Sequence, residues 1–111
     1  GALSISNSTL SGNSAAVDGG AIASFGASTL TLSGCTLSSN TALDGGAVYN
    51  QGTMTVSGCT LSSNSAFDEG GGIYCDNRFN YLMTVSNSVF TSNTPDAIFG
   101  GWSDAGGNTF N

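Results

Sequence analysis

The chain has 111 residues, only 7% of them are charged, and the formal net charge at pH 7 is -6. Arg78 is its one basic side chain, so the basic stripe that binds a phosphate backbone is missing and we expect no nucleic-acid partner. Apolar runs are far shorter than the roughly 20 residues of a membrane-spanning helix, and we expect no membrane insertion.

A short alternating strand opens each repeat of the chain. The apolar period is two in Leu3-Ser-Ile5, which is typical of a strand with one buried face. The same strand recurs at Leu30-Thr-Leu32, Met54-Thr-Val56 and Met83-Thr-Val85. Continuing the alternation predicts a file of small residues and then a file of large ones. These files are Ser8, Cys35, Cys59 and Ser88, followed by Leu10, Leu37, Leu61 and Phe90.

An asparagine follows each large residue at a point where the chain must bend. Asparagine tolerates left-handed backbone dihedrals, and stacked amides can hydrogen-bond from coil to coil. We therefore predict a structural ladder of Asn13, Asn40, Asn64 and Asn93. The repeat returns about every 25 residues, a spacing typical of the stacked coils of a solenoid.

Glycine clusters supply the next corner, where positive φ or close backbone approach is needed. They are Gly19-Gly20, Gly45-Gly46 and Gly70-Gly71-Gly72, and a third strand follows at Ile22, Val48, Ile73 and Ile98. Parallel strands joined by such crossovers are almost always right-handed. The sequence therefore predicts an all-β fold, a right-handed parallel β-helix of about four coils of ~25 residues. We expect residues 1–111 to form a single domain that continues into, or stacks onto, a longer solenoid.

The motifs also carry a family resemblance. Gly-Gly-Ala-Ile or Gly-Gly-Ala-Val alternates with a Leu- or aromatic-led x-x-Asn over residues 3–98, which resembles polymorphic outer membrane protein repeats of bacterial right-handed β-helix proteins. Phe90 keeps the family's phenylalanine, leucine replaces it in the other coils, and the fourth coil lacks Gly-Gly before Ala97. The resemblance implies an extracellular or cell-surface stalk or passenger, often adhesive, without catalytic residues.

Three acids, Asp18, Asp44 and Asp68, fall beside the glycine corner in successive coils. Strands stack about 4.8 Å apart, so these carboxylates would repel unless they splay into solvent or share a cation. Calcium prefers six to eight oxygen ligands, which makes the row a calcium candidate. The alternative is a side-chain-capped turn that repeats because the corner repeats. We expect no cofactor, with calcium as the one candidate ion.

The same row could be the carboxylate pair of a polysaccharide-active enzyme. An acid and a base need different environments, whereas a repeated turn gives each Asp the same one. The chain also has no histidine and no lysine. We therefore predict that the protein is not an enzyme.

One segment, residues 76–82, departs from the repeat and predicts a loop on one face of the solenoid. Arg78, Phe79 and Tyr81 are its candidate binding residues, and surface glycans or proteins of a host or matrix are the partners they suggest. The alternative is a lid over the local core.

Two other sets of residues have ordinary structural interpretations. Cys35, Cys59 and Cys75 lack the paired spacing of a zinc site and are expected to be buried thiols. Outward files of hydroxyls, such as Ser4, Thr31, Thr55 and Thr84, are found in ice-binding solenoids but are common on exposed strands.

These observations favour a non-catalytic structural or adhesive β-solenoid of a secreted or cell-surface protein. Flanking coils, or copies of the chain stacked end to end, are its expected partners. The alternative is a self-assembling extracellular filament subunit; a polysaccharide-active or ice-binding protein is less favoured.

Overall fold

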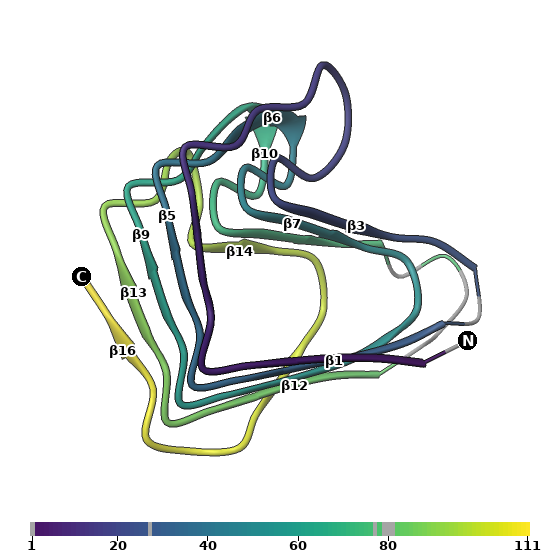
Figure 1. Cartoon of the computed structure of the whole chain (residues 1–111), viewed down its shortest axis with the longest axis vertical. Coiled ribbons are helices and arrows are strands. Elements are labelled where there is room, and N and C mark those ends of the chain that lie inside the picture. Colours follow the sequence, from purple (N-terminus) through teal and green to yellow (C-terminus); the bar gives the residue numbers. More distant parts are fainter. Residues whose placement is uncertain (1, 27, 77, 79–81) are drawn as a thin grey trace.

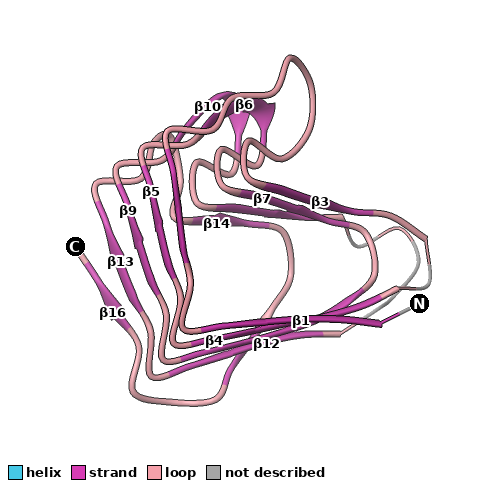
Figure 2. Cartoon of the chain, in the orientation of Figure 1, coloured by secondary structure: helices cyan, strands magenta, loops and turns pink. Residues whose placement is uncertain are grey.

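The computed structural model describes residues 2–26, 28–76, 78 and 82–111. Within these ranges the regular structure is β-strand throughout, and the paired strands run parallel. Figure 1 shows the coils nested one behind another, and Figure 2 shows short strands alternating with turns around each coil. The predicted parallel β-helix of about four coils is confirmed.

Each full coil has three walls, and the first three coils add a projection at one corner. The first wall contains β1 (Ala2–Ser6), β4 (Thr29–Ser33), β8 (Thr53–Ser57), β12 (Met83–Ser86) and β15 (Ser103–Asp104). The second contains β2 (Thr9–Ser11), β5 (Thr36–Ser38), β9 (Thr60–Ser62), β13 (Val89–Thr91) and β16 (Thr109–Phe110). The third contains β3 (Ile22–Ser24), β7 (Val48–Asn50), β11 (Ile73–Cys75) and β14 (Ile98–Phe99). The projection contains β6 (Thr41–Asp44) and β10 (Ser65–Glu69).

Equivalent residues of successive coils lie opposite one another. Leu30 pairs with Leu3 on one side and Met54 on the other, and Leu37 pairs in the same way with Leu10 and Leu61. A slip of one residue would turn each strand's apolar side chains to solvent, so burial of alternate residues fixes this register. The predicted files of like residues are therefore present.

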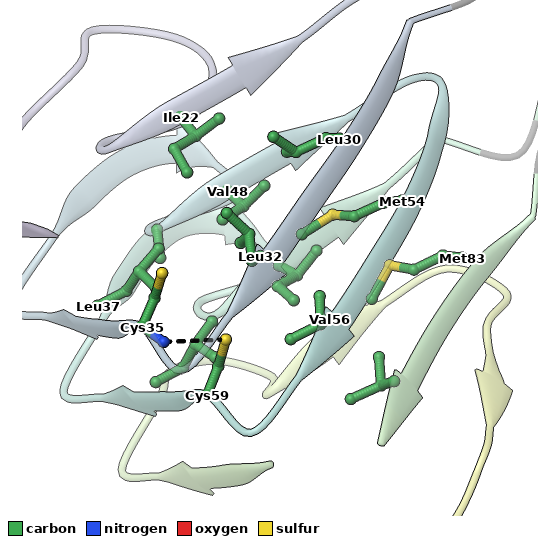
Figure 3. Close-up of a cluster of buried hydrophobic side chains, with 14 of the residues drawn as sticks. Ile22, Leu30, Leu32, Cys35, Leu37, Val48, Met54, Val56, Cys59 and Met83 are labelled. Carbon is green, nitrogen blue, oxygen red and sulfur yellow. Dashed lines mark hydrogen bonds between the residues drawn. The ribbon is translucent and has the colours of Figure 1, made fainter. Parts of the chain in front are cut away.

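The core between the walls is a cluster of buried hydrophobic side chains from successive coils (Figure 3). Leu32 and Met54 have no exposed surface. The backbone N–H of Cys35 donates to Sγ of Cys59 at 3.4 Å, and that of Cys59 donates to Oγ of Ser88 at 3.1 Å. The side chains of Cys59 and Ser88 therefore accept backbone hydrogen bonds in addition to filling the core. Cys35, Cys59 and Cys75 are all buried, as predicted.

The asparagine corner differs from the prediction in one respect. The left-handed residue is the one before each asparagine, with φ near 56° at Ser39, 55° at Ser63 and 56° at Ser92, and Gly12 has the same role in the first coil. A local turn of opposite hand redirects the chain, and the following asparagine keeps its side chain inside the coil. The predicted left-handed asparagine was wrong.

The glycine corner has two separate requirements. Gly45 adopts a positive φ of 66°, whereas Gly46 lies too close to the next coil for any side chain. A Cβ on Gly46 would meet the backbone N of Ser65 at 2.7 Å and the carbonyl oxygen of Gly71 even more closely. The second glycine therefore allows the coils to approach to hydrogen-bonding distance.

This close approach predicts a large difference between two glycine substitutions. We expect Gly46→Ala to lower the free energy of unfolding by about 3 kcal/mol, because backbone atoms cannot move aside as a side chain can. Gly12→Ala has open space around its Cβ and only the cost of a left-handed alanine, about 1 kcal/mol. Urea denaturation measures both values. Equal losses in the two variants would contradict the close-approach explanation.

Candidate functional site

The asparagine ladder joins the described coils along the axis of the solenoid. The backbone N–H and Nδ2 of Asn40 both donate to Oδ1 of Asn64, each at 3.0 Å. Asn13 bonds to Asn40 in the same way at 3.0 and 3.1 Å, and Asn64 to Asn93 at 3.1 and 2.9 Å. The predicted ladder of Asn13, Asn40, Asn64 and Asn93 is therefore present.

The side-chain amides of the two inner members, Asn40 and Asn64, also donate to the preceding coil. Nδ2 of Asn40 donates to the carbonyl of Leu10 at 3.1 Å, and Nδ2 of Asn64 donates to that of Leu37 at 3.0 Å. A single inner amide therefore connects three consecutive coils. Asn40 and Asn64 are completely buried, so no water competes for these bonds.

The acidic corner lies in the projection, on β6 and β10. Asp44 bridges Asp18 on one side, but its register partner on the other side is Glu69 rather than Asp68. Coil three contains one more residue here, and the pairing shifts between Ala66 and Glu69. The expected single row of Asp18, Asp44 and Asp68 is corrected to Asp18, Asp44 and Glu69, with Asp68 displaced in the bulge.

Carboxylate oxygens of Asp44, Asp68 and Glu69 nevertheless lie within 4.8 Å of one another. Burial raises the pKa of Asp44, and repulsion from Asp68 raises it further. The pKa of Glu69 is raised by the same two causes. Oδ1 of Asp44 is buried without a hydrogen-bond partner.

This cluster is the candidate cation site of the described residues. Clustered carboxylate oxygens are the ligands that calcium prefers. Asp18, the first acid of the predicted row, lies outside the cluster. Calcium at Asp44, Asp68 and Glu69 stays a prediction.

The loop between the third wall and the next coil places Arg78 against a buried acid. The guanidinium of Arg78 bonds to Asp76 at 2.7 to 3.0 Å, and the Asp76 side chain is only 6% exposed. Asp76 also accepts from the Tyr49 hydroxyl at 3.0 Å and from Gln51 at 3.4 Å. Through Asp76, this network connects Arg78 to the third wall.

The network also changes the ionisation of its members. The hydrogen bonds from Arg78 hold the pKa of Asp76 well below its usual range. Burial, together with the bond to Asp76, raises the pKa of Tyr49 to about 12. Asp76 is therefore a carboxylate near neutral pH, paired with the exposed Arg78. The other two predicted binding residues, Phe79 and Tyr81, lie outside the described residues.

An aromatic file on the outer side of the third wall was not predicted. The rings of Phe25, Tyr49, Tyr74 and Phe99 follow one another in that order, with centroids 5.4, 5.1 and 5.2 Å apart. The first pair is tilted and the other two are stacked. In the sequence, Tyr49, Tyr74 and Phe99 each follow an aliphatic residue of the third wall, and this recurring pair could have indicated the aromatic file. Tyr49 and Tyr74 each have an aromatic neighbour on both sides, so the file stabilises the wall.

Comparisons with known proteins place the fold in a family. A family model described as a right handed beta helix region matches residues 1–111. Searches of curated proteins and of solved structures found no match to this chain. Among the described residues no helix has the length and hydrophobicity needed to cross a membrane.

The ladder predicts that its inner and outer members differ in importance. We expect Asn64→Ala to lower the free energy of unfolding by about 4 kcal/mol, because it leaves the buried donors of Asn40 without an acceptor. Asn13→Ala should cost about 1 kcal/mol, because among the described residues Asn13 donates to Asn40 and no N–H is recorded as donating to its side-chain oxygen. Urea denaturation measures both, and a small loss for Asn64→Ala would contradict the ladder's role.

The acidic cluster predicts a pH-dependent effect of Asp44→Asn. Because folding raises the pKa of Asp44, this acid stabilises the fold below its ordinary pKa of 3.8, and the stabilisation is lost as pH rises through the folded-state value. The neutral variant should therefore match the wild type near pH 3 and exceed it by about 0.5–1 kcal/mol at pH 7. Unfolding curves across this pH range measure the difference. If the two proteins differed by the same free energy of unfolding at pH 3 and at pH 7, charge repulsion at Asp44 would not be the cause.

Calcium provides the complementary measurement. If the cluster binds the ion, calcium raises the melting midpoint of the wild type and leaves Asp44→Asn nearly unchanged. Identical wild-type midpoints with calcium and with a chelator would eliminate the site.

Proposed function

Because this chain belongs to the right-handed β-helix family, we propose that it is a non-catalytic structural segment of a secreted or cell-surface protein. In this role it acts as a rigid stalk or passenger that holds adhesive surfaces away from the cell. The motif resemblance to polymorphic outer membrane protein repeats supports this finer assignment.

The asparagine ladder is the observation that carries the proposal. Its inner amides each bond to the coil before and the coil after, so bending between coils would break several buried hydrogen bonds at once. Buried amide bonds are expensive to leave unmade. A solenoid built this way is stiff along its axis, which is what a stalk requires.

The surface of the described coils suits an extracellular spacer. Outward positions of the first wall are hydroxyl residues in register, Ser4, Thr31, Thr55 and Thr84. Most of the acids lie on the projection, where burial and mutual repulsion raise the resolved pKa values together rather than apart. An acid and base pair needs separated pKa values, so this pattern supports a non-catalytic role.

A self-assembling filament is the second candidate, and the two end coils favour it. Leu3 at the first coil is 53% exposed and Phe110 at the last is 44% exposed, although both belong to files that are buried in the middle coils. The first coil also borders a hollow of about 300 Å³ lined in part by Leu3, Ile22 and Leu30. Further coils, or a second copy docked end to end, would cover these surfaces.

Sedimentation velocity and negative-stain imaging distinguish the two roles. The stalk proposal predicts one short particle whose sedimentation coefficient does not change with concentration. Fibres that lengthen with protein concentration, and that are absent in a Leu3→Asp variant, would contradict the stalk proposal and support the filament. Turnover of a polysaccharide by the purified chain would overturn both.

A further inference from the structure

The projection is present in three coils and absent from the fourth. It is formed by residues 14–20, 41–46 and 65–71, whereas only four residues separate Asn93 from Ile98 in coil four. Figure 1 shows the fourth coil turning directly from β13 towards β14, without entering the corner that β6 and β10 occupy. The last strand of the projection, β10, pairs with β6 on one edge, and its other edge, towards coil four, is therefore unpaired over much of its length.

The pairing of β10 shows where its free edge begins. Ser65 bridges Thr94, and the N–H of Ala66 donates to the carbonyl of Thr94 at 2.8 Å. Beyond this point no backbone hydrogen bond joins residues 67–69 to coil four in the described chain. The next residue of coil four is Pro95, which has no N–H to donate. An open strand edge of this kind can accept an added strand.

The side chains beside this edge are apolar and strongly exposed. Phe67 is 88% exposed, and Leu43 on the neighbouring strand is 38% exposed. Val17, in the corresponding segment of the first coil, is 55% exposed. Exposed apolar residues scattered singly are ordinary, but a group running across neighbouring strands is typical of an interaction surface.

The charges around the edge define the chemistry of a partner. Asp68 is exposed, Asp44 and Glu69 lie within 4.8 Å of it, and Asp96 acts on Glu69 from coil four. The one basic side chain, Arg78, is bonded to Asp76 in the loop after the third wall. A second copy, with a net charge of -6, would bring like charges together here.

We propose that the edge of β10 at residues 67–69 binds an extended peptide segment of a partner protein in which basic and apolar residues alternate. The peptide adds as a strand in the place that coil four leaves open. Its backbone pairs with β10, its apolar side chains cover Phe67 and Leu43, and its basic side chains face Asp68 and Glu69. This lateral surface goes beyond the stalk role and does not depend on it.

Fluorescence anisotropy with a labelled peptide of alternating lysine and valine tests the proposal. We expect binding that weakens with salt and falls at least tenfold in Phe67→Ser, since a central aromatic anchor contributes most of such an interface. Phe25→Ser is the matched control, because Phe25 is 50% exposed on a different wall. It should bind as the wild type does. Circular dichroism and melting verify that both variants fold.

Two further peptides separate strand addition from simple charge attraction. The same peptide with every backbone amide N-methylated keeps its side chains but has no N–H group to donate to a strand edge. A peptide of equal composition with its lysines in one block keeps the charge without the alternation. We expect both to bind at least tenfold more weakly. Equal binding of all three peptides, or no effect of Phe67→Ser, would overturn the proposal. So would a wild-type dimer that becomes monomeric in Phe67→Ser, because a second copy would then occupy the edge.

Discussion

The buried amide bonds between stacked asparagines are the constraint on which the rest of the fold depends. Asn40 and Asn64 each donate to the coil on either side, in an interior that excludes water. An amide there that loses a partner has no substitute, so the distance and register between coils are fixed at this corner. The files of like residues in the walls follow from that registry.

Because the register of the walls is fixed, coils that differ in their number of residues differ at the projection and not in the core. The additional residue of coil three becomes a bulge that moves Asp68 out of register with Asp44 and puts Glu69 in its place. The short connection of coil four leaves the edge of β10 open instead of distorting the core. Variation that could give the protein a specific partner therefore lies on the projection, while the inner files remain nearly constant.

The sequence was sufficient to predict the walls and the ladder, because period-two strands and a recurring asparagine constrain the register from two independent positions. It was not sufficient at the corners. Ser39 and Asn40 can both occupy a turn, and only the inward amide bonds decide which of them is left-handed.

The sequence also left two contacts undecided. The partner of Asp44 depended on whether the additional residue of coil three lies within the strand or in the turn. The aromatic file could not be predicted from strand register, because the register partner of Tyr49 in the first coil is Ala23. Phe25 lies after the end of β3, and only its ring contacts Tyr49.

Hydrogen exchange of the asparagine side-chain amides, followed by NMR, tests the central claim most directly. The ladder predicts that the Nδ2 protons of Asn40 and Asn64 exchange as slowly as the backbone amides of the walls, because both groups open only when coils separate. Asn111, an exposed residue of the last coil, serves as the reference for free exchange. Exchange of Asn40 and Asn64 at the rate of Asn111 would show that the coils are not held together through these amides.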